Sequence, residues 1–269
     1  LIGAPAASAG GVPVCEVVTM PQPASSLGGI VMDLEQVPGR GTVYAGGVTL
    51  LEDGSYSRQP VVWFGLDGEP QPVGPRDMDG VVHELRPSGL ISGQSTDAAG
   101  RDFAWVQSLR SGRITIVDAG TTERFWVQHI NDRGAAAGAV WISDFDIQAR
   151  VWWPHVDRPG QVLPDNGIGA QAWDLTNDRR VAGAFDIGGF RSQAVIWDAD
   201  GTATPLAGNP GSSVYSSARL INERGEAAGF AWFGGHLEAA RWRTPSELES
   251  LGLLPEGGDS MAYGQAEGG

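Results

Sequence analysis

The stretch Ile130-Asn131-Asp132-Arg133-Gly134-Ala135-Ala136-Ala137-Gly138 decides the fold of this chain, because versions of it recur at a nearly fixed spacing. The closest copy is Asn222-Glu223-Arg224-Gly225 with Gly229. Weaker copies are Asn177-Asp178-Arg179-Arg180 with Gly183, in which Arg180 stands where the first glycine is expected, Arg86-Pro87-Ser88-Gly89 with Gly93, and an eroded form between Gly39 and Gly46. The second glycine of each copy stands at position 46, 93, 138, 183 or 229, which gives a period of 45–47 residues.

A repeat of this length with short β-prone runs inside it is typical of β-propeller blades. Each repeat divides into four such runs, a to d, with Gly, Pro, Asn and Asp between them. In the third repeat these are residues 135–141, 148–153, 160–163 and 170–175. The sequence therefore predicts an all-β propeller of four-stranded blades, either five blades or six with one incomplete.

Two features of the runs predict their packing. Run a consists of small residues, so we expect it to be the innermost strand, with run d far from the axis. Run b carries one tryptophan per repeat, which we interpret as a wedge between neighbouring blades. These tryptophans are Trp63, Trp105, Trp153, Trp197 and Trp242. The Asn-acid pair of each copy is interpreted as a structural turn.

Composition restricts the classes of partner. The 269 residues are 41% hydrophobic and include 40 glycines, which suits one folded domain, expected over residues 11–269. Residues 1–10 resemble the end of a signal peptide or a flexible leader. The net charge is −14 and every basic residue is arginine, so we expect neither nucleic acid nor an anionic membrane as partner. The chain lacks an apolar run of about 18 residues, so membrane insertion is not expected.

Few motifs of known chemistry occur. The single cysteine, Cys15, excludes an intramolecular disulfide and a cysteine-based metal site. The four histidines have no metal-ligand spacing. Nucleophile elbows, phosphate-binding loops and dinucleotide fingerprints are also missing. We therefore expect no metal and no cofactor.

Two copies of the repeat resemble a known family. The elements are Ile130-Asn131-Asp132-Arg133-Gly134 with Gly138, the runs Ala149-Arg150-Val151-Trp152 and Ala240-Arg241-Trp242, and Leu251 to Gly264. This pattern is similar to that of the HAF family of probable extracellular repeats. The resemblance implies a secreted bacterial β-repeat protein and carries over no catalytic residue.

A binding or reactive site in a repeat protein is expected where the repeats differ. One such position lies six residues before the first glycine, on run d. It holds Asp33, His83, Gln128, Asp174, Arg219 and Tyr263, although the alignment at 33 and 174 is approximate. A solvated outer stripe is the alternative interpretation of these polar residues.

The connections between runs a and b are a second candidate, because they combine aromatic side chains with carboxylates. We expect a ligand site there, although the same aromatics could instead cover the mouth of the channel. The predicted ligand-binding residues are Trp141, Asp144, Phe145, Asp186, Phe190, Trp232, Phe233 and His236.

Three functions remain open. The first is a binding domain that recognises a glycan, a small molecule or a protein through these aromatic loops. The second is a propeller lyase, cyclase or hydrolase with acid–base residues in a central channel. The candidates for that role are His83, His129, Asp174, Asp186, Arg219 and His236. The third is a passive segment of a larger surface protein.

Overall fold

The computed structural model describes residues 19–52, 55–76, 78–117, 124–143, 146–154, 160–189, 191–208, 215–253 and 257–263. The chain divides into two compact units, Leu1–Ile116 and Val117–Gly269, and each is considered by itself. The leader expected at residues 1–10 and Cys15 lie outside the described residues. The single domain expected over 11–269 stays a prediction.

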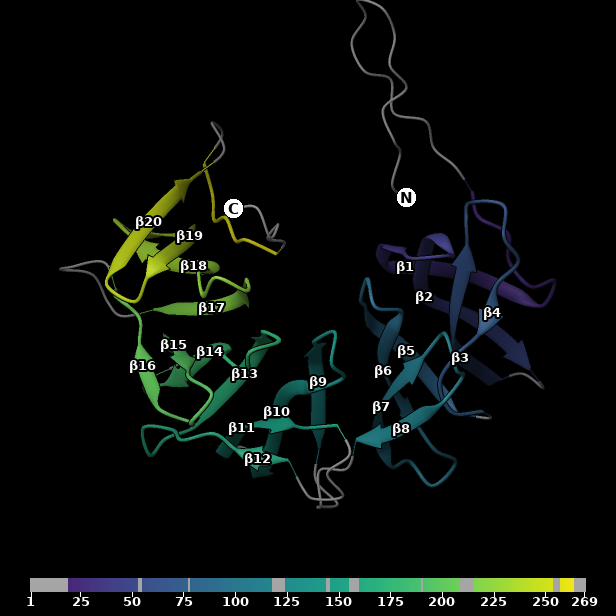
Figure 1. The fold of residues 1–269 in the computed structure, drawn as a ribbon, viewed down its shortest axis with the longest axis horizontal. Helices are drawn as coiled ribbons and strands as arrows, with labels where there is room; N and C mark the ends of the chain where they lie inside the picture. The colour runs from purple at the N-terminus through teal and green to yellow at the C-terminus, as the bar shows by residue number, and fades with distance from the viewer. Residues whose placement is uncertain are drawn as a thin grey trace, which may run out of the picture. The chain divides into compact units, whose positions relative to one another are not determined.

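The first unit contains two antiparallel sheets of four strands, in the order β1-β2-β3-β4 and β5-β6-β7-β8 (Figure 1). The first consists of β1 (Ser26–Val37), β2 (Gly41–Glu52), β3 (Ser55–Phe64) and β4 (Gln71–Pro72). The second consists of β5 (Asp79–Leu85), β6 (Leu90–Thr96), β7 (Asp102–Ser108) and β8 (Ile114–Val117).

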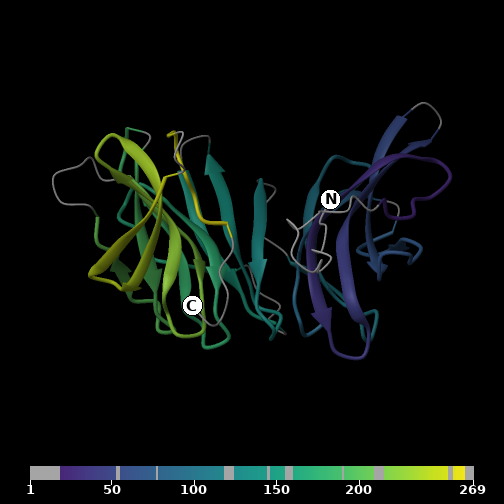
Figure 2. The same cartoon turned by 90° about the horizontal axis from the view of Figure 1, so that it is seen from above.

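The second unit contains three sheets of the same kind. Figure 2 shows their strands running up and down the view. One consists of β9 (Phe125–Ile130), β10 (Ala136–Ser143), β11 (Asp146–Trp152) and β12 (Gln161–Val162). The next consists of β13 (Ala170–Leu175), β14 (Val181–Asp186), β15 (Ser192–Trp197) and β16 (Ala203–Pro205). The last consists of β17 (Ser216–Ile221), β18 (Ala227–Phe233), β19 (His236–Thr244) and β20 (Glu247–Gly252).

These sheets confirm the all-β prediction and the division of each repeat into four strands. All regular secondary structure in the described ranges is β-strand. Burial alternates along the first strand of a sheet, as in β5 and β13, because successive side chains point to opposite faces.

The predicted order of strands was wrong in one respect. Run d pairs with run a of the following repeat, so it is the first strand of the next sheet, and run a is the second strand. In the second unit, β13 contacts both β9 and β17, so the first strands of neighbouring sheets approach each other. Run d therefore does not lie on the far side of its sheet, where we expected it.

The small residues of run a have a different cause from the one we expected. In all five sheets, the second glycine of the repeat lies against a backbone carbonyl of the first strand. A Cβ atom built on the glycine would approach that oxygen to under 3.0 Å, which real Cβ atoms essentially never do. These glycines are Gly46, Gly93, Gly138, Gly183 and Gly229, facing the carbonyls of Ile30, Val81, Trp126, Gln171 and Ser217.

A β-bulge accompanies each of these close approaches. The register of the first strand shifts by one directly after the residue that pairs with the glycine, which leaves the next residue unpaired. The bulged residues are Met32, His83, Gln128, Trp173 and Arg219. The glycine and the bulge are therefore one structural device, repeated in every sheet.

The turns between the first two strands confirm the structural interpretation of the Asn-acid pair. The Asn131 Oδ1 accepts hydrogen bonds from the amides of Arg133 (3.0 Å) and Ala135 (2.9 Å). The Asn222 Oδ1 does the same for Arg224 (3.1 Å) and Glu226 (3.0 Å). These side chains satisfy the backbone donors of the turn, as Asn commonly does.

The fourth sheet corrects the alignment of its repeat. Thr176, and not Asn177, takes the place of the asparagine, since its Oγ1 accepts the Arg180 amide at 3.0 Å. Arg179, with φ of 77°, occupies the left-handed position that Gly134 and Gly225 hold in the other turns. The expectation that Arg180 replaces the glycine was therefore wrong by one residue.

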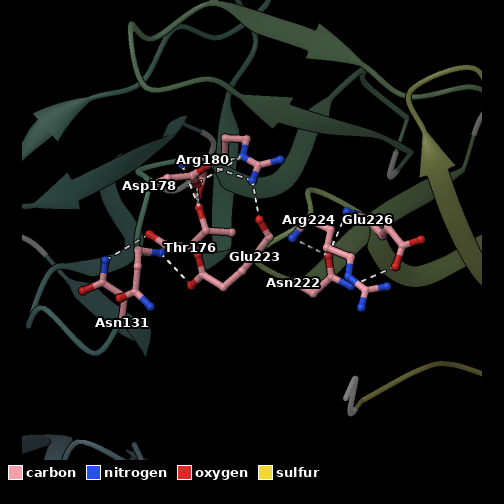
Figure 3. A network of polar contacts seen from close by, with 9 residues as sticks. Asn131, Thr176, Asp178, Arg180, Asn222, Glu223, Arg224 and Glu226 are labelled. Atoms are coloured by element: carbon pink, nitrogen blue, oxygen red, sulfur yellow. Dashed lines mark hydrogen bonds and ion pairs between the residues drawn. The ribbon is translucent and has the colours of Figure 1, made fainter. Parts of the chain in front are cut away.

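Polar contacts join these turns across neighbouring sheets of the second unit (Figure 3). The Asn131 Nδ2 donates to the carbonyl of Thr176 at 3.0 Å. The Arg180 Nη2 donates to the carbonyl of Glu223 at 2.7 Å, and the Glu223 carboxylate accepts the Asn177 amide at 2.8 Å. The repeated turn thus fixes each sheet to the next.

Three tryptophans of run b confirm the wedge interpretation, whereas Trp63 packs in a cluster with Val48, Leu50 and Val61 of its own sheet and Trp153 needs a correction. Trp105 belongs to a core cluster shared by the two sheets of the first unit. Trp197 and Trp242 belong to clusters shared by adjacent sheets of the second unit. In the third sheet Trp152 occupies the paired position opposite Ala136, and Trp153 is only partly buried. Indole donors also find backbone partners, as Trp197 does on the Pro164 carbonyl at 2.7 Å.

Adjacent glycines in β2 test the glycine–bulge device. We expect Gly46→Ala to lower the free energy of unfolding by about 1–3 kcal/mol, since its Cβ collides with the Ile30 carbonyl. Gly47→Ala is the matched control, because its Cβ lies 3.6 Å from the nearest atom, the Gln59 carbonyl oxygen. That control should change stability by less than about 1 kcal/mol. Equal effects in urea unfolding would contradict the device.

Candidate functional site

A pocket of about 210 Å³ lies in the second unit, where the fourth and fifth sheets meet. Strands β13, β14, β17 and β18 supply most of its lining, and the β14–β15 connection supplies Arg191 at its edge. Two of the bulged residues, Trp173 and Arg219, line this pocket. The repeated bulge therefore places two different side chains at one site.

Arg219 is held between aromatic rings. Its Cζ lies 3.5 Å from the ring centroid of Trp173 and 5.5 Å from that of Phe230. Tyr215, which also lines the pocket, packs on Phe230 with ring centroids 5.6 Å apart. Cation–π contacts of this kind position a guanidinium without neutralising its charge.

Three buried polar atoms of the pocket wall have no hydrogen-bond partner. They are the Nε of Arg219, the Nε1 of Trp173 and the Oγ of Ser217. Ser217 is only 2% exposed. Buried polar groups are nearly always hydrogen-bonded in folded proteins, so three atoms without a partner on residues around one cavity are unusual.

The electrostatic surroundings of Arg219 also lack a counterion. Burial lowers the pKa of its guanidinium below the usual range, and the nearby phenols of Tyr263 and Tyr215 oppose this shift. Arg219 forms no ion pair with any carboxylate in the described part of the chain. The pocket thus contains a partly desolvated positive charge.

An aromatic row extends from the pocket across the second unit. Trp173 stacks on Trp126 at 6.2 Å with an interplanar angle of 26°. Trp126 in turn packs edge-on against Trp141, with ring centroids 3.7 Å apart. Trp141, which we expected in a ligand-binding loop, therefore packs against the first strand of its own sheet.

The varied position on run d was partly identified from the sequence. His83, Gln128 and Arg219 are bulged residues, as their alignment implied. At the other two places the bulged residues are Met32 and Trp173, and not Asp33 and Asp174. The error follows from the misplaced glycine of the fourth repeat and from the eroded first repeat.

Asp33 and Asp174 have a structural role that the sequence did not reveal. The Asp174 Oδ1 accepts the Leu175 amide and its Oδ2 accepts the Ile221 amide of the next sheet, each at 2.8 Å. Asp33 forms the same pair of bonds with Leu34 and Leu85, also at 2.8 Å. Each carboxylate therefore links the first strands of two neighbouring sheets.

The other catalytic candidates do not gather at one place within a unit. His129 Nδ1 lies 3.8 Å from Asp174 Oδ1. Asp186 lines the pocket but is exposed, and its Oδ1 accepts the Gly188 amide at 2.8 Å. His236 is exposed at the β18–β19 turn, and His83 belongs to the first unit.

The aromatic loops contribute less than expected. Phe233 packs partly buried against the core cluster of the fourth and fifth sheets. Trp232 lies near the end of β18, where its amide donates to the Tyr215 carbonyl at 2.9 Å. Asp144, Phe145 and Phe190 lie outside the described residues. Of the predicted ligand-binding residues that the structure describes, only Asp186 lines the pocket.

Sequence reasoning missed most of the pocket wall, namely Trp173, Ser217, Tyr215, Phe230 and Arg191. One signal could have identified Trp173, since residues 83, 128, 173 and 219 each stand ten positions before a second glycine. Counting from the second glycine, and not the first, gives the correct register. Tyr215 and Phe230 carry no comparable signal, because aromatics are frequent in the strands of this chain.

No group of three or more His, Cys, Asp or Glu residues in the described ranges could hold a metal ion. The same ranges contain no helix long and apolar enough to cross a membrane.

Comparison with known proteins supports the fold. No protein-family model and no curated protein matches the chain. Among solved structures, the acylaminoacyl peptidase of Pyrococcus horikoshii matches 85% of this chain with a TM-score of 0.54 and 14% identity. This chain spans 40% of that protein.

Two further structures match less closely. The β-propeller domain of the Trilobed protease from Pyrococcus furiosus matches 84% of this chain over 83% of its own length (TM-score 0.44, 11% identity). TolB from Acinetobacter baumannii matches 79% over 60% of its own length (TM-score 0.46, 10% identity). Identities this low concern the fold alone, and the fold itself is given by the repeated four-stranded antiparallel sheets, which are typical of a β-propeller.

The structural role of Asp174 can be tested directly. We expect Asp174→Ala to lower the free energy of unfolding by about 1–3 kcal/mol, because the buried Ile221 amide loses its acceptor. Hydrogen exchange at the Ile221 amide should accelerate. Asp198→Ala, which changes an exposed acid in the same unit, should stay within about 0.5 kcal/mol of the unaltered protein. Unchanged exchange at Ile221 would contradict the linking role.

Proposed function

We propose that this protein is a binding domain that recognises a glycan in the pocket between the fourth and fifth sheets. The observation that carries the proposal is the set of unpartnered buried polar atoms on Arg219, Trp173 and Ser217 around one cavity. Sequence reasoning favoured the loops between the second and third strands as the binding face. The proposal moves the site to the pocket, with Asp186 and Arg191 at its edge.

The chemistry of the wall suits a sugar. The rings of Tyr215 and Trp173, which are both partly exposed, form apolar surfaces that can pack on the C–H face of a sugar ring. The guanidinium of Arg219, a residue that is partly exposed and lines the pocket, can donate hydrogen bonds to its oxygens. Few polar groups placed among aromatic walls are typical of small-ligand sites.

The size of the pocket favours a short ligand or the end of a longer one. Its volume of about 210 Å³ lies below the ~300–1,000 Å³ of typical drug-sized ligand sites. A terminal sugar residue therefore suits the site better than a long internal segment of polysaccharide.

The rival proposal, a propeller lyase, cyclase or hydrolase, has one observation in its favour. His129 Nδ1 lies 3.8 Å from the carboxylate of Asp174. Both oxygens of Asp174, however, accept backbone amides at 2.8 Å, which suits a group that holds strands together. Binding accounts better for the orphaned donors, so we place the rival second.

The resemblance to the HAF family adds an expected cellular location of the protein to the proposal. It implies a secreted bacterial protein, and a glycan is a ligand that a secreted domain meets at cell surfaces. A small molecule or a protein remains the alternative class of partner.

A glycan array with the labelled protein tests the proposal, followed by calorimetric titration of the glycans that bind. We expect Tyr215→Ala to weaken binding on the order of 10-fold or more, because a pocket aromatic is lost. Trp232→Ala, an aromatic of the loop face that does not line the pocket, should leave affinity nearly unchanged. The reverse result would return the site to the loops, and an array without bound glycans would reject the proposed function.

A further inference from the structure

We propose that the glycan bound by this pocket is acidic, and that Arg219 holds its carboxylate. The inference rests on the proposed function and specifies its ligand class. The geometry that carries it is a guanidinium fixed between two rings, beside two other orphaned donors and without an acid of its own.

Arg219 differs from the ion-paired arginines in the described part of the chain. Arg58, Arg86, Arg101, Arg180, Arg241 and Arg243 each form an ion pair with an acid at 2.7–3.2 Å. Arg219 forms none, although its Nε is buried. A positive charge that is withdrawn from water without a partner costs free energy, and an anionic ligand would remove that cost.

The donors of the pocket agree with this assignment. The guanidinium of the partly exposed Arg219 can only donate hydrogen bonds, and it lines the pocket. Arg191 adds a second positive charge to the pocket lining, and Asp186 adds one carboxylate. A wall composed in this way favours a ligand group that accepts several hydrogen bonds and carries negative charge.

The form of the cation favours a carboxylate. A guanidinium presents two parallel N–H groups that match the two oxygens of a carboxylate. The overall charge of −14 gives no general attraction for anions, so recognition must come from these short contacts. A sulfate ester shares the single negative charge, and the experiment separates the two.

The test uses the unaltered protein and matched pairs of sugars. The probes are sialyllactose and oligosaccharides of glucuronate, galacturonate, mannuronate and guluronate, each beside its neutral methyl ester. Galactose 6-sulfate and the peptide acetyl-Gly-Gly-Gly, as acid and as amide, complete the panel. The readouts are the dissociation constant from calorimetry and the indole ¹H–¹⁵N resonance of Trp173, assigned with Trp173→Phe.

We expect at least one acid to bind on the order of 10- to 100-fold more tightly than its ester, the range for a hydrogen bond to a charged group. Arg219→Gln should remove that preference, and Arg219→Lys should restore part of it. Arg133→Gln makes the same change in net charge at an exposed arginine outside the pocket, and it should retain the preference.

The contradicting results are distinct. If esters and acids bind alike, or only neutral glycans bind, the acidic ligand is wrong and the proposed function stands. If galactose 6-sulfate binds as tightly as the best acid, the assignment to a carboxylate is wrong. If only the peptide acid binds, both the acidic sugar and the proposed function are wrong. The comparison of acid with ester decides the inference even if Arg219→Gln fails to fold.

Discussion

The close approach of a first-strand carbonyl to the glycine of the second strand is the constraint on which the rest of this structure depends. It occurs in all five sheets, at Gly46, Gly93, Gly138, Gly183 and Gly229. Any side chain larger than hydrogen would push the two strands apart there. In each sheet the first-strand residue that pairs with this glycine is followed by one extra residue, which has no pairing partner in the second strand.

This device separates what the repeats share from what distinguishes them. The paired positions carry the alanines, valines and tryptophans that form the cores between neighbouring sheets. The bulged position has no partner in the ladder, so its side chain can differ from sheet to sheet. In the second unit the bulged residues include Trp173 and Arg219. The Arg219 Cζ lies 3.5 Å from the Trp173 ring centroid, and both residues line the same pocket. The candidate site is thus a consequence of the backbone geometry that the glycines permit.

Much of the fold could be predicted because the repeat is visible in the sequence. The positions of the glycines marked five repeats but left open a sixth, incomplete blade, and the β-prone runs predicted the strands. The order of strands was not predicted, since Gly and Ala at a strand position fit either convergence on an axis or contact with a neighbouring backbone. The site was predicted in principle, as a place where repeats differ. Its register failed at Asp174 because Arg179 adopts a positive φ that sequence patterns assign to glycine. Tyr215 and Ser217 could not be identified, because their role depends on which sheets adjoin.

Cross-strand nuclear Overhauser effects in the labelled protein test the central claim most directly. The account predicts contacts that pair Ala172 with Gly183 and Asp174 with Ala182, with Trp173 left out of the ladder. The same pattern is predicted for Ala218 with Gly229 and Leu220 with Ala228, with Arg219 left out. A continuous ladder that pairs Trp173 with Ala182 and Arg219 with Ala228 would contradict it.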